Sequence, residues 1–163
     1  MSSAVQTNQL EGRTAVQASS SELEGERNKA LVQRLFDEGF CKGDLSIVDE
    51  MVAPDCKEHQ YFGPNHPDGP EGAKNVIKDL HRLFPDFTLT IDKMVAVGDE
   101  VWIRATGRGT HGGELMGRPA TGKQVKVDVM DICRFENGKM VEHWGVPDRF
   151  HMMIQVGIIP TPQ

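Results

Sequence analysis

The chain has 163 residues, enough for one domain with a sizeable core. Apolar residues make up 38% of the chain and charged residues 26%, as in ordinary globular proteins. The formal net charge of −6 argues against a nucleic-acid partner, because phosphates attract a basic surface. No apolar stretch approaches the roughly 20 residues of a membrane-spanning helix, so no membrane partner is expected either.

Three helices are expected in the first half of the chain. Residues 1–20 lack a hydrophobic period, which predicts a disordered tail before a single domain spanning 21–163. Ser21 is the expected N-cap of the first helix, which Gly43 ends. Asp44 is the expected cap of a shorter second helix, and Pro70 opens a third. Apolar residues recur at helical spacing at Leu31, Val32, Leu35, Phe36 and Phe40, at Leu45, Val48, Met51 and Val52, and at Val76, Ile77, Leu80, Leu83 and Phe84.

Residues 54–70, between the second and third helices, predict a long loop because prolines and glycines are frequent there. Long loops in compact domains are often functional. His59 and Tyr61 are therefore candidates for binding a substrate at the mouth of a pocket. The alternative is that both side chains are simply exposed.

After Pro85 the hydrophobic period changes from helical to alternating, which predicts strands over 87–91, 101–105, 125–135 and 139–144. Gly98-Asp99 is a turn signal, and Asn137-Gly138 is a strong hairpin signal. Asp148 is placed to cap a last helical turn that ends near Gly157. Helices followed by hairpin-linked strands predict an α+β fold. In this fold a strongly bent antiparallel or mixed sheet packs on three N-terminal helices and encloses a pocket.

Asp131 is the first candidate for a catalytic residue. By strand parity it shares one face with apolar residues, namely Val125, Val127, Val129, Cys133 and Phe135. A buried carboxylate needs a partner, and burial moves carboxyl groups towards the pKa range useful for proton transfer near neutral pH. The alternative is a structural Asp that bonds to a neighbouring strand or helix end.

His111, Glu142 and Trp144 are further candidates. If no bulge intervenes, His111 follows the inner residues of the second strand, where it could polarise a carbonyl or shuttle a proton, but a lone histidine is also often structural. On the last strand, Glu142 and Trp144 share the face of Met140 by parity. Both would then line the pocket, with the indole stacked on a flat substrate. The alternative is a core Trp beside a Glu that pairs with an arginine.

The sequence contains no motif for a metal site or for covalent catalysis, and a catalytic thiol stays open as an alternative although nothing singles one out. The six histidines are scattered without metal-ligand spacing, and no nucleophile elbow or phosphate-binding glycine loop is present. Cys41, Cys56 and Cys133 have no paired spacing, which favours reduced thiols in a cytoplasmic protein over a disulfide framework.

Several segments together resemble the SnoaL-like polyketide cyclases, which are ester cyclases of the superfamily shaped like nuclear transport factor two. The resemblance covers about residues 25–160. It is carried by GTHGGELMG at 109–117, PATGK at 119–123, DICRF at 131–135 and GKMVEHW at 138–144. FPDF at 84–87, the opening helix pair and the closing segment 148–160 add to it.

The resemblance implies a cone-shaped α+β barrel, usually a homodimer, that acts on a small-molecule substrate and uses neither metal nor cofactor. It implies ring closure of a polyketide methyl ester by intramolecular aldol condensation. Asp131 matches the position of the family's acid–base aspartate, and His111 would be its helper.

Two groups of alternatives remain open on the same scaffold. One is a hydrolase, isomerase or hydroxylase; an epoxide hydrolase would combine Asp131, Glu142 and Arg104, although Arg104 has the wrong strand parity to meet Asp131. The other is a non-catalytic small-molecule-binding dimeric module.

Overall fold

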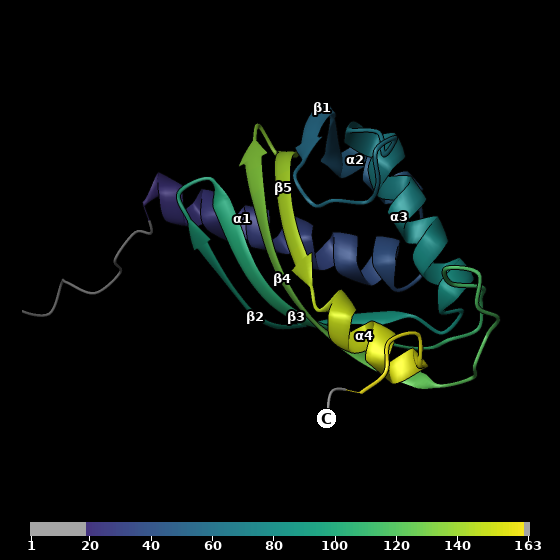
Figure 1. Cartoon of the computed structure of the whole chain (residues 1–163). Helices are drawn as coiled ribbons and strands as arrows, with labels where there is room; N and C mark the ends of the chain where they lie inside the picture. Colours follow the sequence, from purple (N-terminus) through teal and green to yellow (C-terminus); the bar gives the residue numbers. More distant parts are fainter. Residues whose placement is uncertain (1–18, 162–163) are drawn as a thin grey trace, which may run out of the picture.

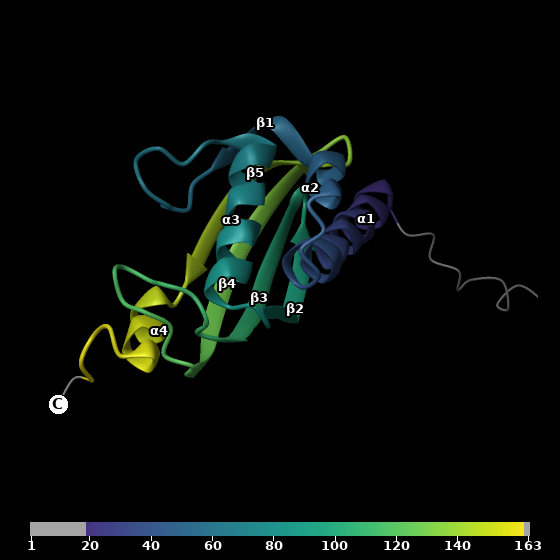
Figure 2. The same ribbon diagram turned by 90° about the vertical axis from the view of Figure 1, so that its right-hand side faces the viewer.

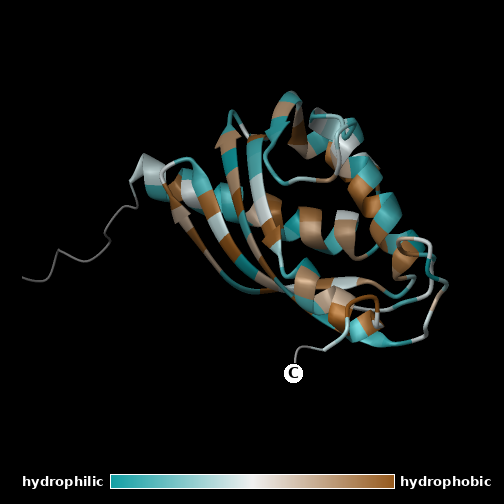
Figure 3. Ribbon diagram, viewed as in Figure 1, coloured by the Kyte–Doolittle hydropathy of each residue, from teal (hydrophilic) through white to brown (hydrophobic). Residues whose placement is uncertain are grey.

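The computed structural model describes residues 19–161, which form one five-stranded sheet with helices against it. The sheet is strongly bent, and the three helices from the first half of the chain lie on its inner side (Figures 1 and 2). Figure 3 shows that apolar and polar residues alternate along the strands, as a sheet with one covered face requires. The α+β fold expected from the sequence is confirmed.

The helices occupy the expected segments, with small shifts at their starts. The N-cap of the second helix is Leu45 rather than Asp44, whose carboxylate accepts from the Ser46 N–H at 2.9 Å and from the Ser46 hydroxyl at 2.7 Å. Helix α1 spans Ser20–Arg34 and continues into a π-helix, Leu35–Phe40. Its N-cap is Ser19 rather than Ser21, because Ser19 and Glu22 form a capping box. Helix α2 spans Ser46–Met51, α3 spans Gly69–Leu83, and α4 spans Arg149–Val156, capped by Asp148 and ended by Gly157. The predicted tail otherwise lies outside the described residues.

The segment predicted as one long loop begins with a strand. Strand β1, Val52–Glu58, pairs in parallel with β5 and forms one edge of the sheet. Its residues do not alternate cleanly between apolar and polar, and Pro54 argues against a strand unless the strand lies at an edge, as it does here. The prediction of a loop over 54–70 is therefore wrong for residues 54–58.

The other four strands follow as antiparallel neighbours, and the complete order is β1-β5-β4-β3-β2. Their bounds are Thr88–Val97 for β2, Glu100–Thr110 for β3, Gln124–Glu136 for β4 and Lys139–Pro147 for β5. Asn137 and Gly138 both have positive φ, 51° and 76°, and connect β4 to β5 as a two-residue hairpin.

A β-bulge in β5 reverses the parity that the sequence predicts for this strand. Phe135 pairs with Met140 and Arg134 pairs with Glu142, so Val141 is the extra, unpaired residue. Met140 therefore shares the inner face with His143. Glu142 and Trp144 lie on the outer face, contrary to the expectation that they line the pocket.

The core lies between the inner face of the sheet and the helices. Val101, Ile103 and Ala105 of β3 are at most 2% exposed, and they pack with residues such as Val48 and Ile77 from the helices. The inner face is thus apolar, and the charged groups on it need an explanation.

Candidate active site

Asp131 lies on the inner face of β4, among the core residues. It is 9% exposed, and its neighbours across the sheet are Ile103 on β3 and Gly145 on β5. The prediction from strand parity that Asp131 lies on the apolar face of the sheet is therefore confirmed. A carboxylate at this depth needs a charged or hydrogen-bonding partner.

The partner of Asp131 is His143, which the sequence does not single out. The Nε2 atom of His143 lies 3.6 Å from Oδ1 of Asp131. On the other side of the ring, Nδ1 donates to the Glu58 carboxylate, 2.8 Å from Oε2 and 3.0 Å from Oε1. Glu58 comes from the end of β1, so three strands supply one carboxylate–imidazole–carboxylate chain.

The two carboxylates set the charge of His143. Burial alone lowers the pKa of an imidazole, but the interactions with Asp131 and Glu58 outweigh burial and raise the pKa of His143 to about 9. The ring is therefore positively charged near neutral pH, with Nδ1 hydrogen-bonded to Glu58 and Nε2 facing Asp131. Asp131 thus faces a cation, and a carboxylate is the form of an aspartate that can accept a proton from a substrate.

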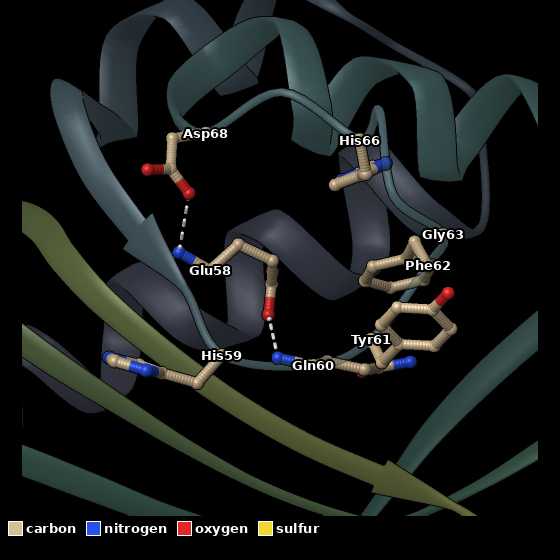
Figure 4. A pocket seen from close by; sticks show the side chains of 8 residues that line it. All are labelled: Glu58, His59, Gln60, Tyr61, Phe62, Gly63, His66 and Asp68. Carbon is tan, nitrogen blue, oxygen red and sulfur yellow. Dashed lines mark hydrogen bonds between the residues drawn. The ribbon is translucent and has the colours of Figure 1, made fainter.

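A cavity of about 180 Å³ lies beside this chain of groups, under the loop that follows β1 (Figure 4). Its lining includes Glu58, which thus connects the cavity to His143. The full lining is Glu58, His59, Gln60, Tyr61, Phe62, Gly63, His66 and Asp68. The site therefore has an inner part, at Asp131 and His143, and an outer part formed by the loop.

Arg149, at the start of α4, anchors the loop. Its Nη1 donates to the Tyr61 carbonyl at 2.8 Å, and its guanidinium lies 4.9 Å from the centre of the Phe62 ring. Burial lowers the pKa of Arg149, and the nearby Glu58 opposes this shift. Tyr61 lines the cavity as the sequence suggests, but 73% of the residue is exposed.

His59, Glu142 and Trp144 are brought together, but away from Asp131. The rings of His59 and Trp144 stack with centroids 4.6 Å apart, and His59 Nε2 lies 3.1 Å from Oε1 of Glu142. Arg134 donates to the other Glu142 oxygen at 2.6 Å, and Arg134 and then His59 lower the pKa of Glu142. Glu142 and Trp144 therefore belong to an outer-face cluster, and His59 lies between that cluster and the cavity rim.

The structure does not bring His111 to Asp131. His111 follows the end of β3, eight residues beyond Ile103, the pairing partner of Asp131, which is about 25 Å along the strand. It is fully buried, and its Nδ1 accepts from the Thr121 backbone N–H at 3.3 Å and contacts the Thr121 hydroxyl at 2.9 Å. These contacts indicate a structural role in holding the loop after β3.

The buried thiols are not poised as nucleophiles. Burial raises the pKa of Cys56 to about 12 and that of Cys133 well above its ordinary value, so both stay protonated near neutral pH. Cys41, Cys56 and Cys133 are all free. Across residues 19–161, no group of three or more His, Cys, Asp or Glu side chains is arranged to hold a metal ion.

The fold and the site together define a small α+β protein with a carboxylate–imidazole–carboxylate chain on the inner face of a helix-covered, bent sheet. The model of the SnoaL-like polyketide cyclase family matches residues 30–156. The chain belongs to the SnoaL-like polyketide cyclase family, as its sequence motifs suggest.

The chain is similar to several relatives over most of their length. The chain is 28% identical to the aklanonic acid methyl ester cyclase of Streptomyces sp. strain C5 over 142 residues, or 82% of this chain and 84% of that protein. The structure of IdmH, a candidate polyketide cyclase from Streptomyces antibioticus, is 34% identical, with a TM-score of 0.71 over 80% of this chain and 98% of IdmH. TsrD from Streptomyces laurentii is 26% identical, with a TM-score of 0.74 over 82% of this chain and 97% of TsrD.

No described helix is both long enough and apolar enough to cross a membrane.

Proposed function

We propose that the protein closes a ring in a polyketide-type ester by intramolecular aldol condensation, with Asp131 as the general acid–base group. The observation that carries this proposal is the buried Asp131 beside an imidazole, 3.6 Å away, that Glu58 holds in place. The similarity to an aklanonic acid methyl ester cyclase supports a methyl ester as the substrate.

The proposed reaction needs no further reactant. The Asp131 carboxylate takes a proton from a carbon between two carbonyls, and the resulting enolate carbon attacks a third carbonyl within the same molecule. A carbon–carbon bond forms, and the new alkoxide takes the proton back from Asp131. His143 remains charged throughout and keeps its positive charge beside Asp131 at the start and end of the cycle.

The alternatives weighed for the sequence are less well supported. Arg104 pairs with Met130 across the sheet and lies on the outer face, so it cannot hold a water molecule with Asp131 as an epoxide hydrolase would require. Family membership indicates an enzyme rather than a passive binding module.

The test is turnover of a panel of β-keto methyl esters, linear and anthraquinone-type, followed by chromatography and mass spectrometry. We expect Asp131→Asn to lose about 10²-fold or more in rate, the usual contribution of a general acid–base group. Asp128→Asn is the matched control, because Asp128 is exposed three residues away on the outer face of the same strand. Equal rates for Asp131→Asn and the parent protein would refute the proposal.

We also propose that the protein is a homodimer, paired through the outer face of the sheet. Trp102, Met130 and Val146 lie there in adjacent cross-strand rows, and they are 47%, 55% and 71% exposed. A second copy related by a two-fold axis would cover this apolar patch with the same patch. Met130→Glu should give monomers in analytical ultracentrifugation, and Met116→Glu, on an exposed loop, should not. An unchanged mass for Met130→Glu would contradict the pairing.

A cytoplasmic location is part of the same proposal, since it is the compartment in which thiols stay reduced, and all three cysteines are free.

A further inference from the structure

The side chain of Gln60 reaches from the cavity to Asp131. If Gly145 carried a Cβ atom, that atom would lie 2.0 Å from Oε1 of Gln60, 2.9 Å from Oδ1 of Asp131 and 2.9 Å from Cε1 of His143. Three side chains from three segments thus converge on one point, and they can do so because residue 145 is a glycine. Gln60 also lines the cavity, whereas Asp131 does not, so a substrate in the cavity meets Gln60 before it meets Asp131.

The main chain of Gln60 is held on both sides. Its N–H donates to Oε1 of Glu58 at 2.7 Å, and the carbonyl of the next residue, Tyr61, accepts from Arg149 at 2.8 Å. Glu58 therefore holds both His143 and the backbone of Gln60. The carboxamide itself makes no hydrogen bond to any residue from 19 to 161 and remains available for a ligand.

The proposed reaction requires a hydrogen-bond donor for the carbonyl oxygen on which charge develops when the neighbouring carbon loses its proton. The histidine expected to fill this role, His111, is buried about 25 Å along the sheet. A carboxamide has two N–H donors, and rotation about its last torsion exchanges its nitrogen and oxygen. Gln60 can therefore turn an N–H towards the point shared with Asp131.

We propose that Gln60 is a catalytic residue whose carboxamide donates a hydrogen bond to the substrate carbonyl oxygen beside the carbon that Asp131 deprotonates. This inference rests on the proposed cyclase function. It also assigns a role to Gly145, because a side chain there would occupy the space of the carboxamide. The substrate is then one with a carbonyl directly beside its acidic carbon, as in a β-keto ester.

Kinetics of Gln60→Leu and Gly145→Ala test the proposal. We expect Gln60→Leu to lower kcat by about 10²–10³-fold, the usual cost of removing one such donor. Gly145→Ala should also lower kcat, because its Cβ would displace the Gln60 carboxamide and would crowd Asp131 and His143, each 2.9 Å away. Full activity of Gln60→Leu would overturn the role of Gln60.

Gln33→Leu is the matched control, because Gln33 is an exposed glutamine on α1, and it should keep the parental rate. If the parent protein turns over an ester and Asp131→Asn does not, but Gln60→Leu is fully active, the cyclase proposal stands and the Gln60 proposal fails.

A second measurement needs no substrate. Gln60→Glu places a third carboxylate near His143 and should raise the pH at which the ring titrates, followed by two-dimensional NMR of the imidazole. An unchanged titration would show that the side chain of residue 60 does not reach Gly145, and it would overturn the inference even if no panel member is turned over.

Discussion

The charge on His143 can be tested by Glu58→Gln, which keeps a hydrogen-bond acceptor for Nδ1 but removes one of the two negative charges beside the ring. The side chains of His143 and Glu58 are each 18% exposed, so their interaction is only weakly screened. A hydrogen bond to a charged group in such a place contributes about 1.5–3 kcal/mol. At 1.36 kcal/mol per pKa unit, this corresponds to roughly 1–2 units.

We therefore expect the pKa of His143 to fall from about 9 to roughly 7–8 in Glu58→Gln. The free energy of unfolding at pH 7 should fall by about 1.5–3 kcal/mol. Two-dimensional NMR of the histidine rings between pH 5 and pH 10 measures the first effect, and urea denaturation measures the second.

Glu142→Gln is the matched control, because Glu142 also contacts a histidine, His59, but on the outer face. It should leave the titration of His143 unchanged. The reasoning is refuted if His143 titrates at the same pH in Glu58→Gln and in the parent protein, or if Glu142→Gln shifts it as much as Glu58→Gln does.

Three further predictions concern stability. The folded-state pKa of His143 is raised from 6.5 to about 9, which corresponds to about 3 kcal/mol of the free energy of unfolding. This stabilisation is complete below pH 6.5 and is lost as the pH rises through 9. Urea midpoints should therefore fall over this pH range in the parent protein but not in His143→Gln. His111→Leu should lower the free energy of unfolding by about 1–3 kcal/mol, because the backbone N–H of Thr121 loses its acceptor, and leave kcat unchanged; a large loss of kcat at unchanged stability would restore a catalytic role for His111. Gly69→Ala should cost about 1–3 kcal/mol, because φ at this position is +73° and a Cβ would lie 2.5 Å from the Pro54 carbonyl oxygen; a melting temperature equal to that of the parent protein would contradict this.

The sequence contains only weak signals that Glu58 and His143 belong to the site. His143 lies in the EHW motif that carries part of the family resemblance, but strand parity counted from Met140 places it on the outer face. Glu58 lies in a segment whose prolines and glycines predict a loop. The two side chains are 85 residues apart in the chain and meet only because β1 pairs in parallel with β5.

The local pattern of apolar, polar and turn residues is enough to predict most of the fold and one residue of the site, Asp131. Helix caps, the change from helical to alternating period and the Asn137-Gly138 hairpin depend on neighbours in the chain, so they can be read from the sequence. Asp131 also follows from local parity, because β4 is regular around it.

The tertiary structure alone decided which groups surround Asp131. Because Val141 is an extra residue in β5, His143 lies on the inner face, whereas Glu142 and Trp144 lie on the outer face. His111 follows the end of β3 and lies at the far end of the sheet from Asp131. The β1–β5 pairing then brings Glu58 and Gln60 to the site. A bulge and a parallel pairing depend on contacts between distant segments, and the alternation of residues along a single strand does not encode them.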